Sequence, residues 1–257
     1  MDVLTDLRAF AQELASIAVE SAKGAKADVE IEIKQDGSPV TTVDKAVERA
    51  VRQRIEDTYP DHGILGEEFG ERNPGADLTW VIDPIDGTRQ FAAGLPNYGI
   101  LIALCDRGRP VIGLICQPDI GDIYLGVTGQ GAWLNGAPVQ VSGATTLKES
   151  IQCISDPDAF DDRTRPGMER LRAASLWNVF DGGCLGFGAL AAGKIGVSVC
   201  GPNLDNFDIL ALVPVVEGAG GVITDWQGKP LDFSSKGEIV ASASPELHQQ
   251  VLALLNG

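Results

Sequence analysis

The stretch WVIDPIDGT occupies residues 80–88. Its apolar run Trp80 to Ile82 predicts a strand that carries two aspartates, Asp83 and Asp86, to the edge of a sheet. Because Pro84 fixes its own φ and cannot extend a hydrogen-bonded ladder, we expect the chain to turn here while both carboxylates leave on one side. Hard cations such as Mg²⁺ prefer carboxylate, carbonyl and water oxygens, so the Ile85 carbonyl is a further candidate ligand. The stretch therefore indicates a metal site at the end of a strand.

Gly87 and Thr88 follow directly and offer backbone N–H groups at a predicted helix start, which is a natural position for a phosphate group. Taken alone, Asp83 to Thr88 is also compatible with an ordinary surface turn. The other acidic segments decide between these two interpretations.

Three further segments carry acidic residues at the ends of apolar runs. GILGEEFG places Glu67 and Glu68 after a short strand, where adjacent acids are often only solvated. NFDILALVPVVEGAGG places Asp208 at the start of an apolar helix, where an acid often only complements the helix dipole. KQDGSPVTTVD has the composition of a turn followed by a capped helix, and its polar residues are Lys34, Asp36, Thr41 and Asp44.

Together these four segments resemble the inositol monophosphatase family, which are magnesium-dependent, lithium-sensitive phosphomonoesterases. The resemblance runs over nearly the whole chain and rests on KQDGSPVTTVD, on GEE at Gly66 to Glu68, on WVIDPIDGT, and on FD…GAGG from Phe207 to Gly221. It implies a five-layered αβαβα sandwich, α+β in its first part and α/β in its second. It also implies a homodimer that requires two or three Mg²⁺ ions.

The resemblance also implies roles for individual residues. One metal would be held by Glu67, Asp83 and the Ile85 carbonyl, and a second by Asp83, Asp86 and Asp208. Gly87 and Thr88 would bind phosphate through backbone amides, with Asp86 and Asp208 beside the substrate. The catalytic residues would be Asp44 and Thr88, which orient and deprotonate the attacking water, assisted by Glu67. Lys34 would lie on a mobile loop over the site.

The composition agrees with a small-molecule substrate. A formal charge of -16 and a pI near 4.4 weigh against nucleic acid and anionic membranes, because both require neutralising Lys and Arg. An acidic protein that binds a phosphate ester needs cations to invert the local field. The N-terminus has the pattern of an amphipathic helix and not of a signal peptide, and the five scattered cysteines predict buried thiols. A cytoplasmic location is therefore expected.

The organisation is predicted as two halves, residues 1–145 and 146–257, joined by the polar stretch SGATTLKES (142–150). The first half would hold most metal ligands, and the second would supply Asp208 and substrate contacts. The expected strands are 29–34 (half-buried), 64–65, 78–82, 98–105, 110–116, 123–127, 139–141, 151–155, 195–200, 221–225 and 238–241. The expected helices are an N-terminal helix, a helix from Thr42 to before Pro60, 167–174, 184–193, one that follows Asp208, and 245–255.

The substrate is less well defined by the sequence. Segments such as GLPNYGILIAL and GLICQPDIGDIYLG resemble the histidinol-phosphatase branch of the family. The substrate-facing stretch departs from both this branch and the inositol enzymes: relatives typically have an acid where this chain has Gly183, and Cys200 stands near the place of a substrate-contacting glutamate. Three hypotheses follow: a histidinol-phosphate phosphatase, an inositol or broad sugar monophosphatase, and a non-catalytic metal-binding regulatory protein. The third is disfavoured because every expected metal ligand is present.

Overall fold

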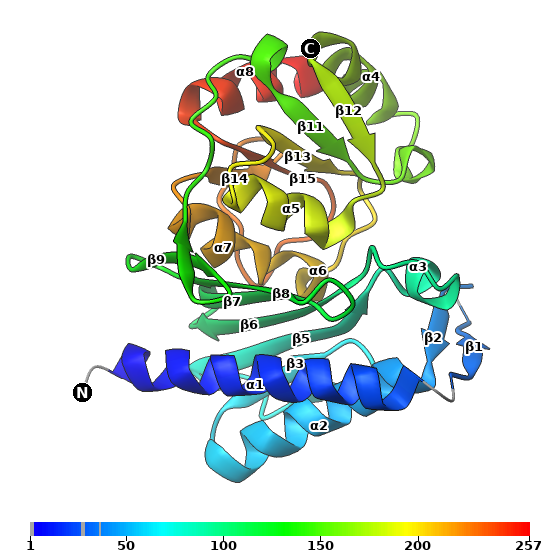
Figure 1. The fold of residues 1–257 in the computed structure, drawn as a ribbon, viewed down its shortest axis with the longest axis vertical. Helices are drawn as coiled ribbons and strands as arrows, with labels where there is room; N and C mark the ends of the chain where they lie inside the picture. The colour runs from blue at the N-terminus through cyan, green and yellow to red at the C-terminus, as the bar shows by residue number, and fades with distance from the viewer. Residues whose placement is uncertain (1–2, 27–28, 36) are drawn as a thin grey trace.

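The structure is a computed structural model that describes residues 3–26, 29–35 and 37–257. Its helices and sheets alternate in five layers, helix, sheet, helix, sheet, helix (Figure 1). The predicted αβαβα sandwich is therefore confirmed. Asp36, which belongs to the KQDGSPVTTVD motif, lies outside the described residues.

The first two layers are a helix pair and an eight-stranded sheet. The helices are α1 (Val3–Ala25) and α2 (Thr42–Thr58). In spatial order the strands are β10 (Ala137–Val139), β9 (Gly131–Leu134), β8 (Asp122–Val127), β7 (Arg109–Gln117), β6 (Gly99–Asp106), β5 (Leu78–Asp86), β3 (Gly63–Gly66) and β4 (Gly70–Arg72). All neighbouring strands of this sheet are antiparallel except β3 and β5, which are parallel.

The middle helices lie between this sheet and a second, five-stranded one, and two more helices cover the far face. The middle helices are α5 (Gly183–Ala191), α6 (Asn206–Ile209) and α7 (Leu212–Gly218). The second sheet has the order β12 (Trp177–Phe180), β11 (Ile151–Ile154), β13 (Val197–Cys200), β15 (Ile239–Ser242) and β14 (Val222–Asp225). The outer helices are α4 (Arg165–Ala174) and α8 (Pro245–Asn256), and two short 3₁₀ turns are η2 (Leu147–Glu149) and η3 (Pro157–Ala159).

Side chains of β5 point in turn to the helix pair α1 and α2 and to the middle helices. Trp80 and Ile82 are buried against α1 and α2, whereas Val81 is buried in the cluster that includes α5, α6 and α7. Side chains of a strand alternate between faces, so the next odd residue, Asp83, faces the middle helices. The layer order therefore directs Asp83 toward the segment that carries Asp208.

Close approach of the middle helices to the first sheet depends on glycine. A methyl group at Gly113 on β7 would collide with the Ala211 carbonyl, and one at Gly126 on β8 would collide with the Pro214 carbonyl. The absence of a side chain at both positions lets the backbone of this helical segment rest directly on the strands. None of the helices in the described part of the chain has the length and apolar content that a membrane span requires.

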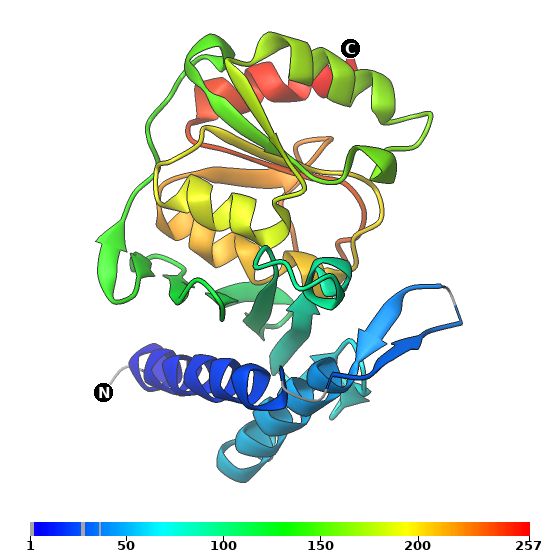
Figure 2. The same ribbon diagram turned by 45° about the vertical axis from the view of Figure 1, so that its right-hand side comes forward.

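These elements differ from the sequence predictions at several points. The strand expected at 29–34 is only β1 (Ile31–Ile33), which pairs with β2 (Pro39–Thr41) in an exposed two-stranded ribbon (Figure 2), so it is not half-buried. The single helix expected after Asp208 is broken into α6 and α7, because Pro214 cannot donate a hydrogen bond to the Leu210 carbonyl. Strand β12 was not predicted, since only one edge of it is paired and it receives little burial.

Candidate active site

Strand β5 does not turn at Pro84 as the sequence suggested, but runs on to Asp86 with a register shift against β6 between Asp83 and Asp86. Residues three apart on a regular strand face opposite sides of the sheet. The irregularity adds one step to this alternation, so that two residues three apart can face the same side. Ile85 is buried with Trp80 against α1 and α2, and Asp86 joins Asp83 on the other face. The D-P-I-D sequence thus places two carboxylates on one face of a strand.

Two neighbouring elements bring further acids to the same place. Oxygens of Asp83, Asp86 and Asp208 lie within 4.8 Å of one another, with Asp208 supplied by α6. Strand β3 is parallel to β5, and the Glu67 N–H that follows it donates to the Ile82 carbonyl at 3.2 Å. This pairing puts Glu67 beside Asp83. An all-oxygen cluster of this kind fits a hard cation such as Mg²⁺.

The negative charges of these carboxylates are poorly balanced by other groups of the protein. Burial raises the pKa of Asp83 well above its usual value, and the charges of Glu67 and Asp208 raise it further. Burial and the charge of Asp86 raise the pKa of Asp208 to about 8. Buried like charges are unfavourable unless a cation is bound among them. The electrostatics therefore agree with a metal-binding role for the cluster.

Asp86 is oriented by the start of α5. One carboxylate oxygen, Oδ2, accepts a hydrogen bond from the Cys184 N–H at 2.8 Å. Gly183 has a φ of 48°, and a methyl group there would stand 3.0 Å from the same oxygen. The absence of a side chain at Gly183 thus allows the chain to pass close to Asp86, which leaves Oδ1 for another partner.

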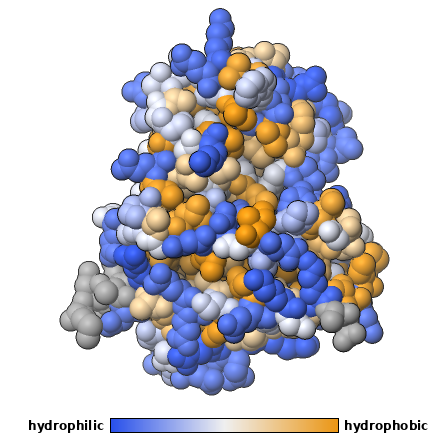
Figure 3. Space-filling model, viewed as in Figure 1, coloured by the Kyte–Doolittle hydropathy of each residue, from blue (hydrophilic) through white to orange (hydrophobic). Residues whose placement is uncertain are grey.

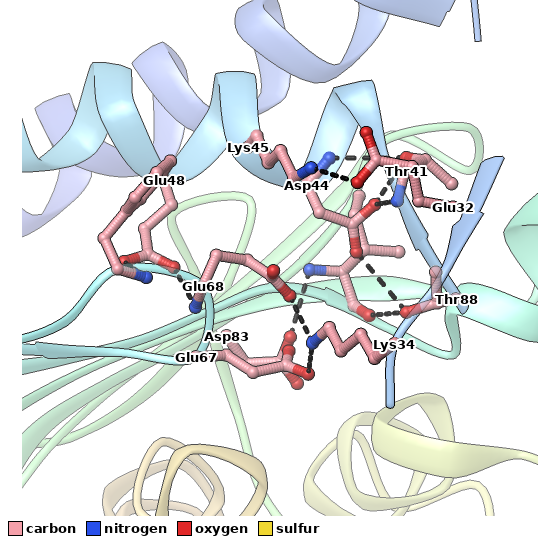
Figure 4. A network of polar contacts seen from close by, with 12 residues as sticks. Glu32, Lys34, Thr41, Asp44, Lys45, Glu48, Glu67, Glu68, Asp83 and Thr88 are labelled. Atoms are coloured by element: carbon pink, nitrogen blue, oxygen red, sulfur yellow. Dashed lines mark hydrogen bonds and ion pairs between the residues drawn. The ribbon is translucent and has the colours of Figure 1, made fainter. Parts of the chain in front are cut away.

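Asp44 and Thr88 lie next to each other, as Figure 4 shows. The Thr88 hydroxyl lies 3.0 Å from the Ile85 carbonyl and 3.4 Å from Asp44 Oδ1. Asp44 Oδ2 accepts the Thr41 N–H at 2.9 Å, in the capping box that begins α2. Burial raises the pKa of Asp44 although the Thr41 hydrogen bonds lower it. The pair predicted from the resemblance is thus in contact.

Lys34 bridges two acids of the neighbouring turn (Figure 4). Its Nζ is 2.9 Å from Glu67 Oε1 and 2.6 Å from Glu68 Oε1. Burial alone would lower the pKa of Lys34, but the hydrogen bonds to Glu68 and Glu67 raise it overall. The buried Glu48 carboxylate accepts the Glu68 N–H at 2.7 Å and so holds this turn in place.

A pocket of about 350 Å³ opens beside the cluster. Asp86, Asp208 and Glu67 line one end. Gly87 begins α3 (Thr88–Ala92) with a φ of 88°, and the first N–H groups of a helix have no partner within it. The lining also includes Gly183 and Cys200, where the sequence departs from the family pattern, together with residues that the sequence analysis overlooked: Gln90, Ser155, Asp156 and Asp181.

Comparison with known proteins agrees with this geometry. The model of the inositol monophosphatase family matches residues 3–257. The chain belongs to the inositol monophosphatase family. Its enzyme class is that of the phosphoric monoester hydrolases.

Individual members of the inositol monophosphatase family resemble this chain over most of its length. It is 36% identical over 231 residues to the chloroplastic bifunctional phosphatase IMPL2 of Arabidopsis thaliana, covering 86% of this chain and 66% of that protein. It is 36% identical over 210 residues to a histidinol-phosphatase of Chlorobaculum parvum, covering 81% of each. An inositol monophosphatase structure from Zymomonas mobilis superposes with a TM-score of 0.90 at 33% identity over the full length of both chains.

Proposed function

We propose that this protein is a Mg²⁺-dependent phosphomonoesterase that hydrolyses the phosphate ester of a small alcohol. The observation that carries the proposal is the grouping of Asp83, Asp86 and Asp208 within 4.8 Å beside the pocket. Two or three Mg²⁺ ions would be held by these residues, by Glu67 and by the Ile85 carbonyl. When bound, such ions supply charge neutralisation of the phosphate oxygens and lower the pKa of water.

Residues of the chain would bind the phosphate, orient the attacking water and accept its proton. Backbone N–H groups of Gly87 and Thr88 would bind phosphate oxygens at the start of α3. Thr88 and Asp44, assisted by Glu67, would orient the attacking water and accept its proton. Burial raises the pKa of Asp44, which makes it a stronger proton acceptor than an ordinary aspartate. Asp86 and Asp208 would border the bound ester on the metal side.

We propose histidinol phosphate as the first candidate substrate, on the similarity to histidinol-phosphatase relatives. A specific observation favours an inositol phosphate or a broad range of sugar phosphates as the second. Gly183 and Cys200 line the pocket without presenting a carboxylate, so at these two positions no charge pairs with an amine.

We further propose that residues 1–145 and 146–257 form two units. The first sheet ends with β10 at Val139 and the second begins with β11 at Ile151, which supports a boundary between them. The five free, buried cysteines suit a reducing compartment, and we propose the cytoplasm.

A homodimer is proposed as the functional assembly. The edge strand β12 leaves Trp177 63% and Val179 51% exposed, and hydrophobic surface is visible over this strand in Figure 3. A second copy of the chain would cover this edge. Light scattering of the wild type and of Trp177→Asp tests the assembly, with a dimer expected for the former only. A monomeric wild type at micromolar concentration would contradict it.

The activity is tested by phosphate release from a panel that contains histidinol phosphate, inositol phosphates, sugar bisphosphates and adenosine phosphates, with Mg²⁺ and with chelator. We expect hydrolysis of at least one member in Mg²⁺ and none in chelator. Turnover that persists in chelator would overturn the metal-dependent assignment, and the ranking within the panel decides between the two candidate substrates.

A further inference from the structure

The lining of the pocket includes a second polar pair, Gln90 and Asp181. Gln90 lies on α3, two residues after Thr88, and Asp181 lies between β12 and α5. The Gln90 Nε2 donates to Asp181 Oδ2 at 2.7 Å. Neither residue belongs to the group of carboxylates that could hold a metal.

The backbone of Asp181 is held firmly in an unusual conformation. Its φ is 57°, a left-handed value that non-glycine residues seldom adopt. Its N–H donates to the Ile154 carbonyl at 2.8 Å, and its carbonyl accepts from Asn97 Nδ2 at 3.2 Å. These contacts fix the direction of the side chain at the pocket wall. Among the described residues, Asp181 Oδ1 has no hydrogen-bond partner, so this oxygen remains available to a ligand.

Asp181 also lies close to the reacting group. Three residues further on, the Cys184 N–H donates to Asp86 Oδ2 at 2.8 Å, and a methyl group at Gly183 would stand 3.0 Å from the same oxygen. The charge of Asp181 contributes to the raised pKa of Asp86, although burial is the larger cause. A phosphate held at Asp86 and Thr88 would therefore direct its ester oxygen and alcohol toward the wall that Gln90 and Asp181 form.

The remaining lining of the pocket is mixed. Cys184, Cys200, Phe187 and Leu204 contribute apolar or weakly polar side chains, Gly183 has no side chain, and Ser155, Asp156 and Asn203 add polar groups from other loops. A free carboxylate oxygen on such a wall is a strong hydrogen-bond acceptor for a hydroxyl or an ammonium group, and charged hydrogen bonds exceed neutral ones in strength.

We propose that Asp181, positioned by Gln90, determines alcohol specificity by accepting a hydrogen bond from a donor group on the leaving alcohol. This inference rests on the proposed phosphatase function. It assigns the recognition to a residue two positions before Gly183. Gln90 is a positioning residue, because its amide already occupies the other carboxylate oxygen.

The test compares two esters with the same carbon skeleton, glycerol 2-phosphate and isopropyl phosphate, which differ by two hydroxyl groups. For the wild type we expect kcat/KM to be higher for glycerol 2-phosphate. Asp181→Gly removes the carboxylate and suits the left-handed φ, so the ratio of the two kcat/KM values should fall at least about tenfold. Asp181→Asn retains an acceptor and should lose less of the ratio.

Gln90→Ala should raise KM for glycerol 2-phosphate severalfold with a smaller change in kcat, because Asp181 loses its support. Asp162→Asn removes an exposed aspartate outside the pocket and is the matched control, with an unchanged ratio. Melting temperatures measured in parallel show whether each variant is folded.

Two results would overturn the assignment of Asp181: a wild type that hydrolyses both esters without preference, or an Asp181→Gly variant whose ratio is unchanged, as when it loses kcat/KM equally for both esters. A wild type that hydrolyses no phosphate ester of the panel in Mg²⁺ would instead overturn the proposed function, and the inference with it. The two failures are therefore distinguishable.

Discussion

Two parts of the pocket lining differ in how they are built. The part proposed to bind phosphate, here called the phosphate end, consists of carboxylates from β5, from the turn after β3 and from α6. The part proposed to contact the alcohol, here called the alcohol end, contains Gln90 and Asp181 together with Gly183 and Cys200, which stand where the family pattern has acids. The phosphate end is dominated by one short sequence whose backbone irregularity aligns two aspartates. The alcohol end is assembled from separate loops, and its polar pair bridges α3 and the turn after β12. Two of the cluster's aspartates thus come from one short sequence, while the Gln90–Asp181 pair depends entirely on contact between segments far apart in the chain.

The largest effect is expected at the phosphate end, for Asp86→Asn. Loss of a carboxylate from the cluster should lower Mg²⁺-dependent kcat/KM by at least about 10³-fold, or about 4 kcal/mol of transition-state stabilisation. The fold should be retained, because the change removes one of several mutually repelling buried charges. Steady-state kinetics and thermal unfolding check both points, with Asp162→Asn as control. Near-normal turnover would exclude Asp86 as a metal ligand.

The second effect concerns the hydroxyl of Thr88. Thr88→Ala removes the group that lies 3.0 Å from the Ile85 carbonyl and 3.4 Å from Asp44 Oδ1, and kcat should fall by about 10²-fold. Thr88→Ser keeps the hydroxyl and should retain most of the activity. If the two variants lose kcat equally, the methyl group rather than the hydroxyl matters, and the Asp44–Thr88 assignment is wrong.

The sequence and its family resemblance predicted that Asp83, Asp86 and Asp208 lie together, as they do, but not the irregularity that aligns the first two. The pattern around Pro84 indicated that both carboxylates leave on one side, yet the structure achieves this by a register shift within a continuing strand. Register depends on the partner strand β6, and a short local stretch carries no information about it. The layered fold followed from the family resemblance, because alternating helices and strands are compatible with several architectures.

The residues at the alcohol end were missed for a physical reason. Gln90 and Asp181 are 91 positions apart, and neither stands in a pattern that marks chemistry. The sequence Asp181-Gly182-Gly183 is itself typical of a turn, which was the one available signal. Their meeting depends on how α3 docks against the loop after β12, and that packing is set by the whole middle layer.

Metal removal should affect stability most at alkaline pH. The folded-state pKa of Asp208 is about 8, above its ordinary 3.8, so its contribution to stability is complete below pH 3.8 and is lost as pH rises toward 8. Bound Mg²⁺ favours the ionised carboxylates and should offset this loss. The rise in melting temperature caused by Mg²⁺ should therefore be several degrees larger at pH 8 than at pH 6.5.

The lower pH is chosen because of His248, whose pKa is lowered to about 4 by burial. Stability from this neutral histidine is complete above pH 6.5 and is lost only as pH falls toward 4, so it does not contribute between the two measurements. Asp208→Asn should reduce the difference between pH 6.5 and pH 8. An equal Mg²⁺ effect at both pH values in the wild type would show that the cluster is not the binding site.

A smaller effect is expected for a substitution at Gly183, which lies beside Asp86. Gly183→Ala places a methyl group 3.0 Å from Asp86 Oδ2 and imposes a left-handed φ on a residue with a side chain. The cost to stability should be about 1 kcal/mol, and the Mg²⁺ concentration for half-maximal activity should rise severalfold. Unchanged Mg²⁺ dependence would mean that the α5 start does not orient Asp86.

The smallest effect is expected at the alcohol end, for Cys200→Ser. Cys200 lines the pocket, but burial keeps the pKa of its thiol well above its ordinary range, so it is uncharged under assay conditions. Replacement by a neutral hydroxyl of similar size should change kcat/KM by less than about threefold, or about 0.7 kcal/mol, for every ester of the panel. A larger loss confined to one substrate would show that the thiol contacts the alcohol directly, and specificity would then belong to β13 as well as to the turn after β12.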